Sequence, residues 1–176
     1  MKKWDVGLIV GRFQPVHKGH IHAVKYALSK VEELVIGIGS AQYSHELKNP
    51  FTAGERFRMI RLALDENHVT RDRYCIIPLH DTRTHSIWAA QVIAYTPKFN
   101  VVFTNDPLTA GLFREANFQV EPVPFLSRGN YNATGVRNRI LEGKPWENLV
   151  PKSVAAMIKN IGGVERIRNL AKTDYV

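Results

Sequence analysis

The stretch that decides the fold covers residues 6–40 and reads VGLIVGRFQPVHKGHIHAVKYALSKVEELVIGIGS. It opens with a short apolar run at residues 6–10, which predicts a buried strand. Between residues 18 and 31 the apolar side chains recur at spacings of three and four, which predicts an amphipathic helix. A second apolar run follows at residues 34–38. The stretch therefore predicts one β-α-β unit with parallel strands and a right-handed crossover.

The same alternation of strand and helix continues along the chain. Thr52 and Glu55 form a capping-box pattern that opens a helix reaching about residue 66. Further strands are expected at 74–79, 101–104 and 118–123, and further helices at 86–95, 107–116, 134–142, 151–161 and 163–171. This order predicts an α/β fold: a Rossmann-like open parallel sheet of about five strands, with helices on both faces and a helical C-terminal segment. Because no linker, repeat or low-complexity tract interrupts it, we expect one domain over residues 1–176.

The amino-acid composition limits where this protein is expected to act and what it is expected to bind. The chain lacks a run of about 18 apolar residues and an N-terminal signal pattern, so we expect a cytoplasmic protein without a membrane span. Its single cysteine, Cys75, lies in an apolar run and is expected to be a buried small hydrophobe. One thiol forms neither an internal disulfide nor a multi-cysteine zinc site. The net charge of +8 suits nucleic acid, an anionic surface or phosphate-rich substrates, and charge alone leaves these open.

The loop after the first strand carries the residues that favour phosphate chemistry. It lacks both the glycine fingerprint of dinucleotide-binding folds and the Walker pattern of P-loop NTPases. His17 and His20 stand three residues apart at a predicted helix start, where backbone N–H groups and the helix dipole favour phosphate. Gly19 permits a close approach to the backbone, and Lys18 and Arg12 add positive charge. A metal site built on the two histidines is disfavoured, because no third ligand has a suitable spacing.

Several stretches together resemble a known family. The segment from Gly11 to His20 resembles the histidine-x-glycine-histidine signature of one nucleotidyltransferase superfamily. Within that superfamily the chain resembles the archaeal type of nicotinamide mononucleotide (NMN) adenylyltransferase. The other matching stretches are IGSAQ at 38–42, NPFTAGER at 49–56, TGVR at 134–137, LVP at 149–151 and GVERI at 163–167. The resemblance implies transfer of AMP from ATP to the 5′-phosphate of NMN, with nicotinate mononucleotide as an open second acceptor, and release of pyrophosphate.

The resemblance also implies roles for single residues. His17 and His20 would hold the α- and β-phosphate oxygens of ATP, and Arg137 would hold the β- and γ-phosphates. Arg12 would bridge toward the mononucleotide phosphate. Mg²⁺ would be bound through the ATP phosphates, without a ligand from a protein side chain. The other residues expected to bind ATP or its phosphates are Gly11, Phe13, Lys18, Gly19, Lys48 and Thr134; of these, Lys48 replaces the arginine common in the family and loses its bidentate fork.

A second group of residues is expected to hold the nucleosides. Ligands of open parallel sheets bind beyond the carboxyl ends of the strands. The residues expected there to contact nucleoside and ribose are Gly39, Ser40, Gln42, Asn105 and Asp106. By the resemblance, Trp88 would stack on the nicotinamide ring, whereas the residues alone fit core packing equally well. Phe125 and Leu126 would form the second wall of that pocket, and the order of the pair leaves open which of them reaches the ring.

Two other functions stay open on the sequence. A flavin or pantetheine phosphate could replace NMN as acceptor with the same transfer chemistry. Alternatively, the chain could be a basic nucleic-acid-binding or NAD-sensing module without turnover, whose binding to nucleic acid would depend steeply on salt. The resemblance instead implies small-molecule substrates, no nucleic-acid or membrane partner, and a homohexamer.

Overall fold

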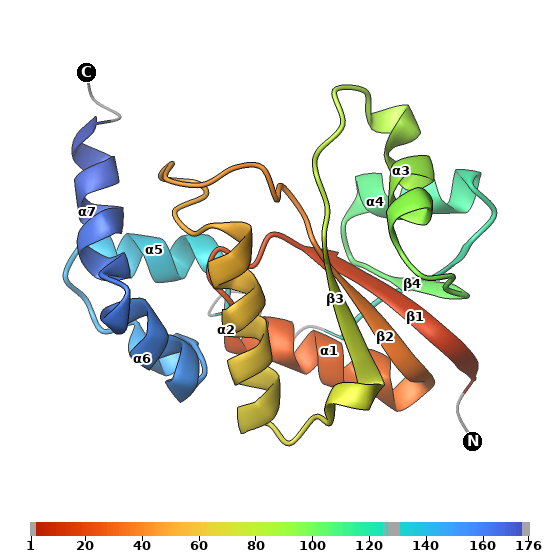
Figure 1. The fold of residues 1–176 in the computed structure, drawn as a ribbon, viewed down its shortest axis with the longest axis horizontal. Helices are drawn as coiled ribbons and strands as arrows, with labels where there is room; N and C mark the ends of the chain where they lie inside the picture. Colours follow the sequence, from red (N-terminus) through yellow and green to blue (C-terminus); the bar gives the residue numbers. More distant parts are fainter. Residues whose placement is uncertain (1–2, 125, 127–130, 174–176) are drawn as a thin grey trace. The chain divides into compact units, whose positions relative to one another are not determined.

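The computed structural model describes residues 3–124, 126 and 131–173. The chain forms two compact units that alternate along the sequence (Figure 1). The first unit contains Met1–Gly11, His22–Ala41 and Thr70–Pro124, and the second contains Arg12–Ile21, Gln42–Val69 and Phe125–Val176. The expectation of a single domain stays a prediction.

One parallel sheet with the strand order β3-β2-β1-β4-β5 forms the centre of the first unit. Its strands are β1 (Trp4–Gly11), β2 (Val31–Ile38), β3 (Tyr74–Pro78), β4 (Val101–Phe103) and β5 (Gln119–Glu121). Central β1 pairs with β2 from Trp4↔Val31 to Gly11↔Ile38 and with β4 from Gly7↔Val101 to Ile9↔Phe103. The five parallel strands and the Rossmann-like order confirm the predicted fold class.

Helices cover both faces of this sheet. Helix α1 (Lys18–Lys30) lies on one face, where Tyr26 meets the ring of Phe103 edge-on at 6.3 Å. Helices α3 (Trp88–Tyr95) and α4 (Pro107–Glu115) cover the other face, and Figure 1 shows them on the opposite side of the strands from α1. The core on that side comes from alternate strand residues and both helices: Leu8, Val35, Leu79, Ala89, Val92, Phe99, Val102 and Phe113. Cys75 packs against this core but is half-buried rather than buried.

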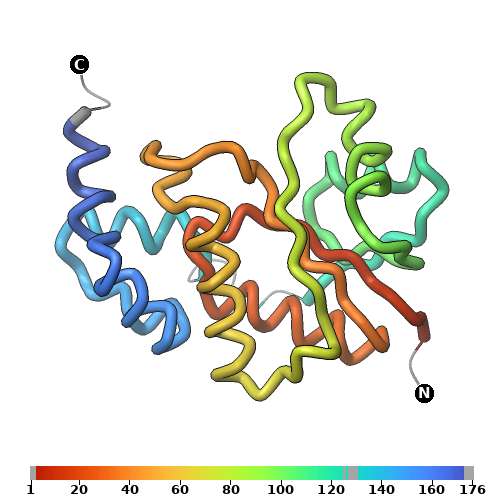
Figure 2. Tube along the Cα trace, in the orientation of Figure 1, coloured from red at the N-terminus to blue at the C-terminus, as the bar shows by residue number. Residues whose placement is uncertain are grey.

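All the regular secondary structure described in the second unit is helical. It contains α2 (Ala53–Glu66), α5 (Ala133–Leu141), the 3-10 turn η3 (Glu147–Leu149), α6 (Lys152–Asn160) and α7 (Gly163–Thr173). Figure 2 follows the chain from β2 through an irregular loop into α2. The capping box is confirmed, since Thr52 accepts from the Glu55 N–H and Glu55 accepts from the Thr52 N–H. Helix α6 packs against both α2 and α7, and α5 packs against α7.

The differences from the expected elements lie at their ends. Helix α1 stops one residue before the predicted end, because Val31 is buried as the first residue of β2. The helix predicted at 86–95 is a 3-10 turn, η2 (His85–Ile87), followed by α3. Strand β5 is shorter than predicted because Pro122 cannot donate to a neighbouring strand. Within the described residues, no helix is long and apolar enough to cross a membrane.

The aromatic core of the first unit yields a stability prediction. Phe113 is fully buried, and the rings of Trp88, Phe99 and Phe118 meet it edge-on at 5.6 to 5.9 Å. Phe113→Ala should lower the free energy of unfolding by about 3–5 kcal/mol, because it removes these contacts and leaves a cavity. Leu108→Ala, at a half-exposed position on the same helix, should change it by less than about 0.5 kcal/mol. Urea denaturation followed by circular dichroism measures both, and equal losses would contradict the packing.

Candidate functional site

Hydrogen bonds at the carboxyl edge of the sheet join the end of β1 and the loops after β2 and β3 in the first unit. The Gly39 N–H donates to the Gly11 carbonyl at 2.9 Å, which extends the pairing of β1 with β2 by one residue. Ser40 has a positive φ of 51° and donates its N–H to a carboxylate oxygen of Asp81 at 3.2 Å. The Ala41 N–H donates to the Leu79 carbonyl. The loop after β2 is therefore held by the loop after β3.

The two residues expected to contact ribose have structural partners within the first unit. The Asn105 carboxamide donates to the Val123 carbonyl at 2.7 Å and accepts from the Val123 N–H at 3.0 Å. Asp106 is the N-cap of α4, and its Oδ2 accepts from the Thr109 N–H at 2.8 Å. Both side chains thus shape the loop that follows β4, and the ribose contacts stay predictions.

The expected nicotinamide pocket is described only in part. Trp88 is the first residue of α3, is half-buried, and lies edge-on to Phe113 in the first unit. Trp88 therefore packs against the core through its contact with Phe113, as the core-packing alternative predicts. Leu126 is 40% exposed, and Phe125 lies outside the described residues. Stacking of Trp88 on a nicotinamide ring stays a prediction.

The two histidines of the signature form a reciprocal pair in the second unit. The His17 N–H donates to Nδ1 of His20 at 3.2 Å, and the His20 N–H donates to Nδ1 of His17 at 3.3 Å. Their rings are stacked, with centroids 3.6 Å apart and planes at 25°. Because each Nδ1 accepts a hydrogen bond, the proton of each neutral ring belongs on Nε2. Each ring can then donate one Nε2–H to a ligand.

Burial keeps both rings neutral at ordinary pH. It lowers the pKa of His17 to about 4, and it lowers the pKa of His20 well below its usual value, with a smaller contribution from the charge of His17. The Phe13 ring lies 4.6 Å from the His20 ring. A Cβ on Gly19 would lie 3.0 Å from the His17 ring and 3.2 Å from Cβ of Tyr131, so a larger residue there would press on the His17 ring.

A cavity of about 390 Å³ lies in the second unit near the start of α5. Three chain segments line it, with the residues Arg12, Leu47, Lys48, Thr134, Arg137 and Asn138. Three of the six carry positive charge, and no acidic residue is among them. A concave site with this charge is suited to a polyphosphate. The structure therefore brings four of the expected phosphate-binding residues to one cavity. Its lining does not include the two histidines His17 and His20, nor the other expected residues Gly11, Phe13, Lys18 and Gly19.

Arg137 is buried at this cavity and is held by hydrogen bonds of its own. Its Nη1 donates to the Gln14 carbonyl at 2.7 Å and its Nη2 donates to the Thr134 hydroxyl at 3.2 Å. Burial lowers the pKa of Arg137, and the neighbouring charge of Arg12 lowers it further. Two guanidinium groups that disfavour each other's charge are stabilised by an anion between them. Helix α5 is capped by Asn132, which accepts from the Gly135 N–H at 2.6 Å.

Sequence reasoning missed two lining residues, Leu47 and Asn138. Asn138 follows Thr134 by four residues on α5, and this helical spacing was the signal that could have placed it beside Thr134. Leu47 lies in an irregular loop, where no periodic signal exists. Over the described residues, no group of three or more His, Cys, Asp or Glu side chains could hold a metal ion.

The buried histidine yields a pH prediction. The unfolded His17 ring titrates near 6.5 and the folded ring at about 4, so the unfolded chain binds the extra proton between these values. The free energy of unfolding should therefore fall as the pH drops from 6.5 toward 4, and this histidine should contribute up to about 3 kcal/mol of the loss.

Urea unfolding at pH 7, 6 and 5 measures this loss. His17→Gln should flatten the pH dependence, whereas His68→Asn, at an exposed histidine of the same unit, should leave the wild-type slope. Parallel curves for wild type and His17→Gln would refute a buried neutral ring at residue 17.

Comparison with known proteins shows the family of this chain. The cytidylyltransferase-like family model matches residues 8–149. A nicotinamide-nucleotide adenylyltransferase of Pyrococcus furiosus is 55% identical over 166 residues, which cover 94% of this chain and 88% of the relative. A protein of the same name from Thermoplasma acidophilum is 45% identical over 173 residues, covering 98% of this chain and 96% of the relative.

A solved structure is also similar along nearly the whole chain. It is a bifunctional NMN adenylyltransferase/ADP ribose pyrophosphatase from Francisella tularensis, complexed with AMP and a manganese ion. It matches with a TM-score of 0.80 and 25% identity over 98% of this chain. This chain spans 53% of that longer, bifunctional one. The chain therefore belongs to the cytidylyltransferase-like family and, within it, to the nicotinamide-nucleotide adenylyltransferases.

Proposed function

We propose that this protein transfers AMP from ATP to the 5′-phosphate of NMN, giving NAD and pyrophosphate. A phosphate oxygen of NMN attacks the α-phosphorus of ATP, and the bond from that phosphorus to the bridging β-phosphate oxygen breaks. No protein nucleophile takes part, and Cys75 has no role. The observation that carries the proposal is the cationic cavity lined by Arg12, Lys48 and Arg137, in a chain more than half identical to relatives named for this activity.

His17 and His20 act in this proposal as neutral hydrogen-bond donors. Their Nδ1 atoms are engaged by backbone N–H groups, which leaves Nε2–H of each ring to hold α- and β-phosphate oxygens. Donors fixed in place before the reaction stabilise charge that develops on the transferring group. The Phe13 ring packs against the His20 ring, and Gly19 leaves room beside the His17 ring. Contacts of Phe13 and Gly19 with the ATP phosphates are part of the proposal.

The charged residues of the cavity hold the rest of the triphosphate. Arg137 uses two of its five N–H donors in hydrogen bonds to Gln14 and Thr134. Its other N–H donors remain for the β- and γ-phosphates. Arg12 reaches toward the NMN phosphate, and Lys48 supplies a point charge. ATP enters as its Mg²⁺ complex, so the metal is part of the substrate and needs no cluster of protein ligands. A divalent metal is supported by the manganese ion and AMP bound to the similar Francisella protein.

The remaining expected contacts are proposals as well. Gly39, Ser40 and Gln42 would lie against the nucleoside, and Gly11 and Lys18 would lie at the ATP phosphates. Asn105 and Asp106 would contact a ribose; since Oδ2 of Asp106 caps α4, its other carboxylate oxygen would accept the hydroxyl. Trp88 would stack on nicotinamide, with Leu126 or Phe125 opposite. The resemblance to archaeal enzymes supports a homohexamer, a cytoplasmic location and one domain over residues 1–176.

An acceptor panel tests the proposed activity. The protein is incubated with Mg-ATP and, separately, NMN, nicotinate mononucleotide, flavin mononucleotide and phosphopantetheine, and dinucleotide and pyrophosphate are measured. We expect NAD and pyrophosphate in equal amounts with NMN. Turnover with flavin mononucleotide or phosphopantetheine, but with neither NMN nor nicotinate mononucleotide, would contradict NMN as the acceptor and support the other acceptor. No turnover at all, with salt-sensitive binding of RNA or DNA, would favour the nucleic-acid-binding alternative.

A histidine variant tests the proposed donor role. His20→Ala should lower kcat by about 100- to 1000-fold, the usual effect of losing one donor to a developing charge. His68→Asn, at an exposed histidine of the same unit, should keep wild-type kcat. Wild-type kcat in His20→Ala would remove this histidine from the mechanism.

A further inference from the structure

Arg56 is a fully buried arginine that the proposed transfer chemistry does not use. It lies in the first turns of α2, at the end of the NPFTAGER stretch. Burying a guanidinium costs free energy unless its N–H donors are paired. The hydrogen-bond partners of Arg56 therefore indicate which parts of the chain it positions.

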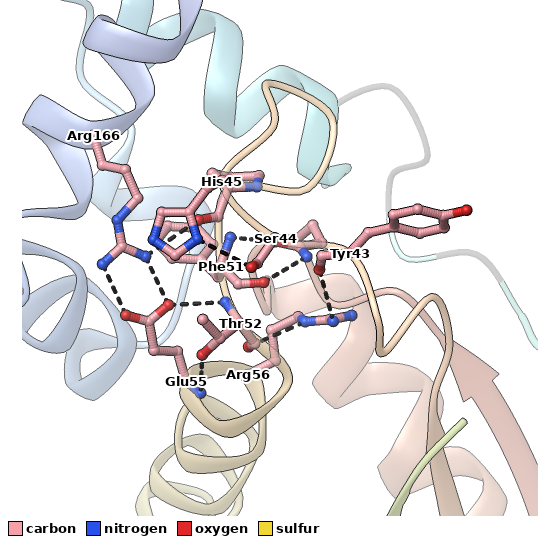
Figure 3. A network of polar contacts seen from close by, with 10 residues as sticks. Tyr43, Ser44, His45, Phe51, Thr52, Glu55, Arg56 and Arg166 are labelled. Atoms are coloured by element: carbon pink, nitrogen blue, oxygen red, sulfur yellow. Dashed lines mark hydrogen bonds and ion pairs between the residues drawn. The ribbon is translucent and has the colours of Figure 1, made fainter. Parts of the chain in front are cut away.

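The guanidinium donates to backbone carbonyls of three chain segments. Its Nη1 donates to the Arg12 carbonyl at 2.9 Å, and its Nη2 points to the Tyr43 carbonyl at 3.5 Å. Its Nε donates to the Thr52 carbonyl at 3.3 Å, at the start of its own helix. Figure 3 shows the contacts to Thr52 and Tyr43. All three segments belong to the second unit.

Two of these segments supply cations to the phosphate cavity. Arg12 lines the cavity with its own side chain, and the Tyr43 segment leads within five residues to Lys48. Between Tyr43 and Lys48 the loop is irregular, and its far end is closed by paired backbone hydrogen bonds between Glu46 and Asn49. Arg56 thus holds the backbone at Arg12 and at the entry to the loop of Lys48.

The helix start that carries Arg56 is itself fixed. Glu55 forms a bidentate ion pair with Arg166 at 2.7 and 2.9 Å, and it closes the capping box with Thr52 (Figure 3). Arg166 also donates to the Pro50 carbonyl at 3.2 Å. The backbone that carries Arg56 is therefore held in place. A shift of the Arg56 guanidinium would move the Arg12 and Tyr43 backbone to which it donates.

We propose that Arg56 is a positioning residue for the phosphate site: it sets the backbone of Arg12 and of the Lys48 loop so that both cations face one cavity. The inference rests on the proposed function, because it takes this cavity as the place where the ATP phosphates bind. A planar fork holds two carbonyls from different segments in one fixed geometry, which the compact ammonium of lysine on its flexible stem does not reproduce. The competing explanation is that Arg56 only stabilises the fold.

The test separates affinity for a polyphosphate from stability. Arg56→Lys, which keeps the charge, is compared with Met59→Ala, which empties a fully buried position on the same helix. Binding of pyrophosphate is measured by calorimetry at a temperature where each variant is folded, and the melting temperature of each is recorded. We expect Arg56→Lys to weaken pyrophosphate binding about tenfold or more, as loss of one hydrogen bond to a charged partner does. Met59→Ala should keep wild-type affinity at a comparable or larger loss in melting temperature.

Each outcome decides the question. Wild-type affinity in Arg56→Lys overturns the positioning role, and so does an equal loss of affinity in Met59→Ala. A wild-type protein that does not bind pyrophosphate overturns the proposed phosphate site, and the inference with it. If Arg56→Lys does not fold, amide exchange in the wild type decides. Pyrophosphate should slow exchange at residues 12–14 and 43–48 together, and slowing at only one of these segments overturns the inference.

Discussion

The hydrogen bonds of the backbone between Arg12 and Gln14 are the constraint on which the phosphate site depends. This segment is irregular and largely buried, so its polar groups need partners that no helix or sheet supplies. Arg56 donates to the Arg12 carbonyl, and Arg137 donates to the Gln14 carbonyl. The Gln14 carboxamide in turn pairs with both backbone groups of Phe51, at 2.8 and 2.9 Å. Side chains from distant parts of the second unit therefore determine the backbone conformation of the segment that carries Arg12.

The site combines residues that carry positive charge with neutral hydrogen-bond donors. Arg12, Lys48 and Arg137 supply positive charge around one cavity, whereas the buried His17 and the half-buried His20 are kept neutral. Two further positive charges on stacked rings 3.6 Å apart would repel each other, and the reciprocal backbone hydrogen bonds at Nδ1 exclude them. Fixed cations thus match the charge of a triphosphate, and neutral donors match the oxygens at which charge develops.

Residues with a functional expectation also serve the fold. Asp106 caps α4 and Asn105 fastens the loop after β4, so a substitution at either changes backbone geometry as well as any contact to a nucleoside. Arg137 likewise lines the cavity and holds the first loop. Loss of activity in such variants is interpretable only beside a measured stability.

The sequence by itself determined the order and type of the elements, the capping box at Thr52 and the superfamily signature, because periodicity, caps and short motifs are local patterns. It also named Arg12, by its place in the loop of the histidine pair, and Lys48, Thr134 and Arg137, through resemblance. Only the tertiary structure decided that these four meet at one cavity, that His17 and His20 cap each other's N–H groups, and that Arg56 holds the first loop. Those facts depend on contacts such as that between Arg137 and Gln14, which lie 123 residues apart. A contact over that distance is made by the packing of the whole unit, and no local pattern records it.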